Sequence, residues 1–225
     1  MQPLDVPSFI AKPTGNLSLD IFPLISLLSC LPTLRIYWLT KRRADFVIFS
    51  VGFVIAGIYH YCYLHKDGLE ASEFLGLNGS VWRTLDIVWA YGCLVRTLGH
   101  VIGAHHTCTL ALTNVVFPVG IIFEIYRNPG LKLMPLGLGT LIALSSLKIT
   151  VEGLKTFPRF SKGHGLRAFL WAFLGFTCFV LPNRLAMYWF WHSLWHLFLG
   201  LCYYELYVDL ERENLSKCSK KIRNE

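Results

Sequence analysis

Long apolar runs separated by short polar segments dominate the hydropathy pattern of this chain of 225 residues. A transmembrane helix needs about 20 mainly apolar residues, because the hydrocarbon core of a bilayer is about 30 Å thick. Windows of this length fit at 20–39, 45–64, 82–103, 107–126, 131–152, 166–187 and 188–210. Only a turn around Pro182 and Arg184 separates the last two windows. The pattern therefore predicts an all-α, polytopic membrane protein, a bundle of seven transmembrane helices.

The composition agrees with this interpretation, since 54% of the residues are hydrophobic and 16% are charged. Mean hydropathy is +0.47. The pattern divides the chain into an extracellular N-terminal segment, 1–19, a single transmembrane domain, 20–210, and a basic cytosolic tail, 211–225. The first twenty residues lack a basic stretch followed by an apolar run, so no cleavable signal peptide is predicted.

Basic residues lie mainly on one side of the predicted bundle. They gather at 41–43, in 155–167 and in 217–223, whereas the opposite loops hold Asp67, Glu70 and Glu73. Short cytoplasmic loops carry an excess of Lys and Arg, which predicts an extracellular N-terminus and a cytosolic C-terminus. The net charge of +7 does not indicate nucleic-acid binding, because the basic residues form no single patch with interleaved aromatic residues.

Covalent modification is indicated at three positions. Asn16 and Asn78 begin glycosylation sequons on the predicted outer side, and Cys218 in the basic tail is a candidate for palmitoylation. The seven cysteines are mostly scattered through the predicted helices, with no C-x-x-C pair, so no disulfide framework is expected.

Two histidines, His192 and His196, lie one helical turn apart within the last apolar segment. Spacing of four residues puts both on one helix face. Ionisable residues at membrane depth are costly and usually face the bundle interior, where they mark functional sites. Alternating chain direction brings His60, at the outer end of the second helix, and Asp86, at the outer start of the third, to a similar depth. The prediction is that these four residues meet.

Three imidazoles and a carboxylate at one level match the ligands that zinc prefers. We expect His60, His192 and His196 to be ligands at about 2.0–2.1 Å from the ion. Asp86 would either ligate the metal or orient a metal-bound water. The alternative is a buried polar network without metal, in which Asp86 pairs with a protonated histidine. The other histidines are predicted to be solvated or at the cytoplasmic surface: His65, His100, His105, His106 and His164.

The ordered set of His60, Asp86 and His192-x-x-x-His196 resembles the CREST superfamily of seven-helix membrane proteins, which includes alkaline ceramidases and adiponectin/progestin receptors. Within it the chain is most similar to the myomaker family of muscle cell-fusion proteins, and the similarity covers essentially the whole chain. Further matching segments are 32–34, 41–43, 60–62, 85–86, 91–92, 135–137, 139–140 and 192–193.

The resemblance implies a plasma-membrane protein, with transit through the Golgi, that promotes fusion of myoblasts. Zinc would tie the second, third and seventh helices together. The implied partners are membrane lipids and a second fusogenic protein or a partner on the apposed cell. A small-residue helix face around Gly137 and Gly139 is compatible with a homodimer.

Two other functions remain open on the sequence. One is a zinc-dependent lipid amidase of the ceramidase type, with Asp86 as general base or orienting group. Hydrolytic members usually have Ser four residues before the second-helix histidine, whereas this chain has Ala56, which favours the fusion function. The other is a receptor like the adiponectin group, whose topology runs opposite to the one predicted here.

Overall fold

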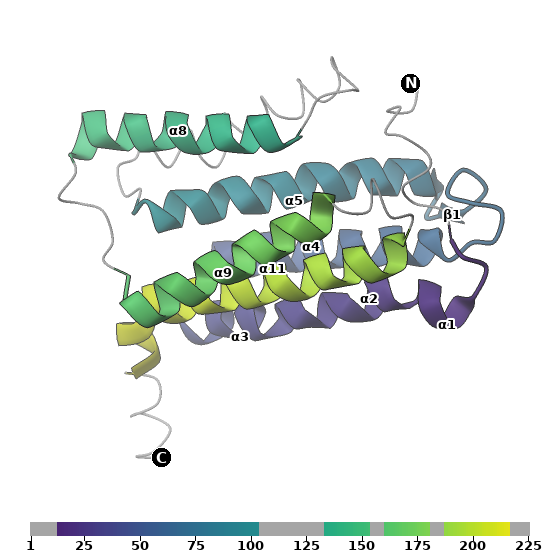
Figure 1. The fold of residues 1–225 in the computed structure, drawn as a ribbon, viewed down its shortest axis with the longest axis horizontal. Coiled ribbons are helices and arrows are strands. Elements are labelled where there is room, and N and C mark those ends of the chain that lie inside the picture. The colour runs from purple at the N-terminus through teal and green to yellow at the C-terminus, as the bar shows by residue number, and fades with distance from the viewer. Residues whose placement is uncertain (1–12, 104–132, 154–159, 181–186, 217–225) are drawn as a thin grey trace. The chain divides into compact units, whose positions relative to one another are not determined.

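The computed structural model describes residues 13–103, 133–153, 160–180 and 187–216 (Figure 1). The predicted helix 107–126, the turn around Pro182 and Arg184, His105, His106 and Cys218 lie outside these residues. The chain divides into two compact units. The histidine unit comprises Ser8–Arg83 and Phe160–Glu225, and the second unit comprises Met1–Pro7 and Thr84–Arg159.

The first predicted helix is a series of short helical segments: α1 (Leu17–Asp20), α2 (Phe22–Ser26), a 3₁₀ turn η1 (Leu27–Cys30) and α3 (Leu31–Leu39). Proline lacks an N–H donor, so it fits the first turn of a helix and disturbs an interior. Pro23 and Pro32 stand in the first turns of α2 and α3 and explain the interruptions. The Asn16 side chain caps α1 by accepting from the Ser18 N–H.

The second predicted helix is α4 (Arg43–Tyr63), which follows a turn at Lys41 with φ of 59°. Within the described residues, Leu17–Leu39 and Arg43–Tyr63 are long and apolar enough to cross a membrane. The described residues are otherwise almost entirely helical, apart from a short hairpin of β1 (Glu73–Phe74) and β2 (Leu77–Asn78). The all-α prediction and the presence of membrane-length helices agree with the structure.

Two long helices, α9 (Lys162–Val180) and α11 (Tyr188–Leu210), lie side by side in the histidine unit (Figure 1). Trp171 stacks on Phe198 with 5.7 Å between ring centroids, and Phe179 packs against Trp195. Gly175 makes room for this contact, because an added Cβ would lie 3.3 Å from Phe198 Cβ. The segments α2, η1 and α3 also contact α11.

An ion-pair network closes one end of α4 and α11. The Arg42 guanidinium bonds Glu211, at the end of α11, and Asp45, in the first turn of α4. Burial acts to lower the Arg42 pKa, but the hydrogen bonds and charges of Glu211 and Asp45 outweigh it and raise that pKa above its ordinary value. Beneath the network, Ile36, Tyr37, Tyr203 and Tyr207 form a buried core.

His164, which was predicted to be solvated, is partly exposed and also pairs with a carboxylate. It lies in the first turn of α9, and its Nδ1 is 2.5 Å from a Glu205 oxygen on α11. Arg167 bonds the same carboxylate through two nitrogens, at 2.8 and 3.0 Å. The pairing arises because α9 and α11 pack together, which hydropathy along the chain does not reveal.

In the second unit, α5 (Gly79–Val101, whose residues from Thr84 onward belong here) is followed by α8 (Leu133–Glu152). Lys148 of α8 is fully buried, and its Nζ donates to the Gly103 carbonyl at 2.5 Å. Asp86 lies in the second turn of α5 and is half-buried.

Candidate metal centre

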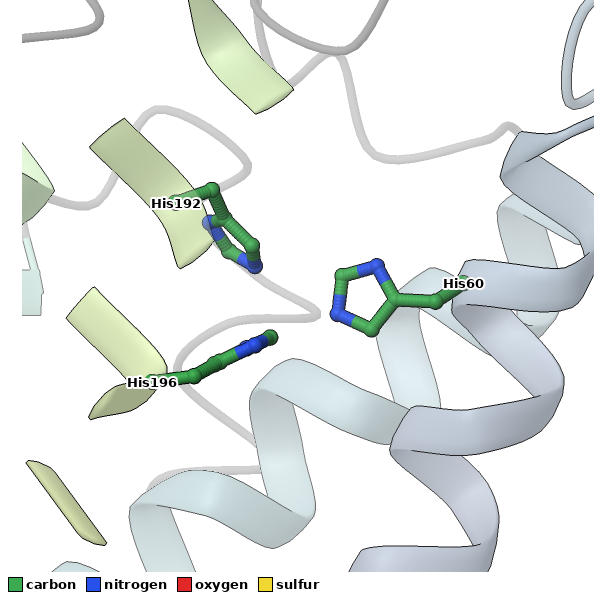
Figure 2. A group of neighbouring side chains, drawn as sticks. All are labelled: His60, His192 and His196. Carbon is green, nitrogen blue, oxygen red and sulfur yellow. The ribbon is translucent and has the colours of Figure 1, made fainter. Parts of the chain in front are cut away.

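Three histidines converge inside the histidine unit. His60 comes from the last turn of α4, and His192 and His196 come from the first half of α11 (Figure 2). Ring centroids are 5.1 Å apart for His60 and His192, 4.9 Å for His60 and His196, and 4.5 Å for His192 and His196. One ring nitrogen from each histidine lies within 4.8 Å of the others. The predicted meeting of these three side chains is therefore observed.

Within the part of the chain that the structure describes, burial leaves ring nitrogens of the cluster without hydrogen-bond partners, at a cost in free energy. His60 is fully buried, and neither of its ring nitrogens has a hydrogen-bond partner among the described residues. His192 Nε2 is buried and unpaired in the same sense. A buried polar atom left without a partner costs roughly 1–3 kcal/mol. A ligand that accepts electron pairs from these nitrogens would remove that cost.

The hydrogen bonds of His196 determine which of its ring nitrogens carries the proton and which is free to bind a metal. Its Nδ1 lies 3.1 Å from the Pro23 carbonyl oxygen and 2.9 Å from Ser26 Oγ. A carbonyl oxygen only accepts hydrogen bonds, so Nδ1 carries the proton and donates. The Ser26 hydroxyl donates to the same Pro23 oxygen at 2.8 Å. The neutral tautomer therefore leaves the Nε2 lone pair of His196 available to a metal, the usual arrangement of ligating histidines.

Aromatic side chains hold the rings in place. Tyr188, one turn before His192, stacks on it with centroids 4.5 Å apart and planes 21° apart. The Tyr188 hydroxyl lies 2.7 Å from that of Tyr59, whose ring in turn packs against His60. Both tyrosines are buried, as is Ala56 one turn before His60. These packed aromatic contacts limit rotation of the imidazoles.

The donor set fits a metal ion with small adjustments. Tetrahedral zinc with nitrogens at about 2.0–2.1 Å needs those nitrogens about 3.3 Å apart. The observed limit of 4.8 Å is wider, so binding would draw the rings inward. Imidazole suits zinc, copper, iron and nickel. Three histidines leave a fourth position, which in catalytic zinc sites holds water or substrate.

The fourth predicted ligand stays a prediction. Asp86 belongs to the second unit, whose position relative to the histidines the structure does not determine. Within the histidine unit, the described residues add no cysteine or carboxylate to the three-histidine group. Sequence reasoning missed Ser26 and the Pro23 carbonyl. The available signal was a serine three residues after a proline within an apolar run.

Comparison with known proteins gives one family. A family model described as "Protein of unknown function (DUF3522)" matches residues 17–197, from the start of α1 into α11. That stretch contains all three clustered histidines and Asp86. No curated protein matches the chain. Because the model covers most of the sequence, including the candidate metal centre, the chain belongs to the DUF3522 family.

Proposed function

We propose that this chain is a multi-pass membrane protein that binds one zinc ion through His60, His192 and His196. The observation that carries the proposal is the set of buried imidazole nitrogens without partners, contributed by α4 and α11. Zinc requires neutral imidazoles and has no redox demand, which suits this buried and uncharged site. The ion would join α4 to α11 at the end opposite the Arg42–Glu211 pair.

The function we propose is promotion of cell–cell fusion at the plasma membrane, as in the myomaker family that the chain resembles. In this role the zinc ion fixes helix geometry, and the outer surface of the bundle meets lipid or a partner on the apposed cell. Ala56 supports a non-hydrolytic role, because no hydroxyl stands one turn before His60.

The direct test is expression of the chain in two populations of non-fusing cells carrying different fluorescent proteins. We expect multinucleated cells containing both colours, and fewer of them for His60→Ala at equal surface expression. Normal surface delivery without any mixing, alone or together with a known fusogenic protein, would reject the fusion function while leaving the zinc site untouched.

One observation favours a second function, a zinc-dependent lipid amidase of the ceramidase type. The three histidines leave a coordination position that no described residue of their unit fills. A zinc ion held there supplies Lewis-acid chemistry that activates water and polarises an amide carbonyl. Asp86 would act as general base or as the group that orients the water.

Hydrolysis is tested with purified protein and ceramides of several chain lengths. The amidase function predicts release of fatty acid that stops on chelation and falls strongly in Asp86→Asn. Zinc-loaded protein that releases no fatty acid from any of these lipids would exclude ceramide hydrolysis and leave fusion as the function to pursue.

A further inference from the structure

The turn of the hairpin after α4 contains an apolar residue with an unusual backbone conformation. Between β1 and β2, Leu75 has φ of 53° and Gly76 has φ of 75°. Two consecutive positive φ values are typical of the two-residue type I′ turn, where Asn-Gly is preferred. Leucine is strained in this region because of its Cβ. Leu75 is nevertheless 78% exposed, more than any other large apolar side chain among the described residues.

Several interactions within the histidine unit hold the hairpin in one conformation. The exposure of Leu75 is therefore a property of an ordered turn. Trp82 Nε1 donates to the Phe74 carbonyl at 3.0 Å. The Gly79 N–H donates to both the Leu69 and Ser72 carbonyls at 3.0 Å, and a Cβ at Gly79 would lie 2.7 Å from the Leu69 oxygen. The strands pair antiparallel, with Phe74 opposite Leu77.

The hairpin lies beside the end of a candidate membrane span. The Phe74 ring is 5.9 Å from the Tyr61 ring, in the last turn of α4, and 6.3 Å from the Trp82 ring. Tyr61 is 58% exposed and continues an exposed apolar face of α4 that also contains Val47, Val51 and Val54. Spacings of three, four and seven residues put these side chains on one side of the helix. An exposed apolar face of this kind is suited to contact with lipid on a helix that crosses a bilayer.

The hairpin extends this face into the region where a membrane meets water. Tyr and Trp gather at such interfaces, because their rings are apolar and their polar atoms reach water. Leu75 and Leu77 are both exposed next to this aromatic group. The same loop carries three exposed carboxylates, Asp67, Glu70 and Glu73, against one exposed lysine, Lys66. This net negative charge does not favour anionic lipids. The fitting occupant is the interfacial layer of a zwitterionic leaflet.

We propose that the hairpin Glu73–Asn78 inserts Leu75 into the interfacial layer of the same bilayer that α4 crosses, as a lipid-binding anchor beside the span. The inference rests on the membrane placement in the proposed function and on neither zinc nor fusion. The strained turn then has a reason, since it directs an apolar side chain to the tip where Asn would be easier to fold.

The test uses the full chain in phosphatidylcholine nanodiscs that hold one copy each. Leu75→Cys carries an environment-sensitive fluorophore, and the parent chain, labelled in parallel, gives the background from the seven native cysteines. We expect strong quenching by lipid with a nitroxide near the top of the acyl chain and several-fold less quenching by aqueous iodide than for Asp67→Cys. Val51→Cys, in the middle of α4, reports whether the helix crosses the bilayer.

The outcomes separate the two proposals. If Val51→Cys escapes quenching by lipid with a nitroxide near the chain end, the membrane placement fails. If Val51→Cys is quenched and the Leu75 label is as open to iodide as Asp67→Cys, the anchor is wrong. If the label at Leu75→Cys is protected from iodide only in discs that hold two copies, the hairpin tip contacts a second chain. That result would overturn the lipid proposal.

A second variant controls for the possibility that a fluorophore at position 75 distorts the turn. Leu75→Asn suits the turn better and removes the apolar tip, so the fold is expected to be kept. A fluorophore at Leu77→Cys should then lose most of its lipid quenching when Leu75→Asn is added. Unchanged quenching at Leu77 would contradict insertion driven by Leu75.

Discussion

At the scale of single residues, the central feature is that the three imidazoles differ in their hydrogen-bond partners. His196 is oriented by Ser26 and by the Pro23 carbonyl of α2, whereas the ring nitrogens of His60 have no hydrogen-bond partner among the described residues. Groups that hydrogen-bond a ligating histidine set its tautomer and its basicity. We therefore propose Ser26 as a positioning residue for the candidate metal centre, which acts through His196 and not as a ligand.

Replacing Ser26 tests this role. Ser26→Ala should lower zinc affinity by about 10- to 100-fold, the usual effect of losing such a partner. The matched control is Ser193→Ala, because the Ser193 hydroxyl donates to the Trp189 carbonyl of its own helix. Competition with a fluorescent chelator measures both affinities. Equal affinities for the two variants would show that Ser26 does not position His196.

At the scale of secondary-structure elements, the close approach of α2 and of η1, which directly follows Ser26, to α11 brings Ser26 to His196. Gly200 permits it, since an added Cβ would lie 2.6 Å from the Ser29 carbonyl oxygen. The Ser29 hydroxyl also donates to the His196 carbonyl at 2.9 Å. Small residues at helix contacts allow backbones to pack closely in membrane proteins. The contact between η1 and α11 and the three-histidine cluster are thus parts of one arrangement.

We expect Gly200→Ala to destabilise the fold by about 1–3 kcal/mol, as overpacking does, and to weaken zinc binding by moving Ser26 away. Gly57→Ala on α4 is the control, because an added Cβ there meets nothing within 4 Å. That change should be neutral or stabilising by about 0.5–1 kcal/mol. Thermal unfolding in detergent and zinc titration give the two readouts. A Gly200→Ala protein as stable and as zinc-avid as the parent would refute the coupling.

The opposite ends of α4 and α11 are joined by charge. Arg42→Gln leaves the buried Glu211 and Asp45 carboxylates without their guanidinium, which should cost about 2 kcal/mol, below the range for fully buried pairs. Arg43→Gln, at the exposed neighbouring position, should change stability by less than about 0.5 kcal/mol. Tm in detergent distinguishes them. An equal, small effect at both positions would mean that the ion pair adds no stability.

The raised pKa of Arg42 gives no pH dependence near neutrality. A raised folded-state pKa contributes stability that is complete below the unfolded-state pKa and is lost only above the folded-state pKa, and for arginine both lie far above neutrality. The Arg42 contribution is therefore present throughout the range in which the protein can be handled.

At the scale of the whole molecule, α4 and α11 run antiparallel and are held at both ends. Arg42 joins the start of α4 to the end of α11, and the histidines join the end of α4 to the start of α11. Residues about 130 positions apart in sequence thus meet at the candidate metal centre. Binding of zinc should stabilise the native fold as a whole, because only the folded chain assembles the three ligands.

Removal of zinc gives the matching prediction. At free zinc about 100 times above Kd, binding adds about 2.7 kcal/mol, roughly 5–11 °C in Tm for a domain of this size. A chelator should lower Tm by that amount in the parent chain and leave the Tm of His60→Ala unchanged. A chelator-insensitive parent with no zinc by elemental analysis would leave the alternative, a polar network without metal.

Part of this architecture could be predicted from local sequence. The window 188–210 coincides with α11, and 45–64 lies within two residues of α4, because apolar length and helix boundaries are local properties. Alternating chain direction was enough to bring His60 toward His192 and His196. The first span was predicted as one continuous helix, whereas its two prolines divide it into shorter segments.

The amino-acid sequence by itself determined the helical character, the bounds of α4 and α11 to within two residues, and the set of histidines that can meet. It did not determine every helix end, since the window 166–187 begins four residues after the first residue of α9 (Lys162–Val180). Only the tertiary structure decided that Pro23 and Ser26 set the tautomer of His196, that Glu205 pairs with His164, and that Leu75 occupies a strained, exposed tip. The physical reason is that the two kinds of information act over different separations along the chain. Hydropathy reports whether a residue prefers an apolar environment, but a hydrogen-bond partner about 170 residues away is fixed only by how the helices pack.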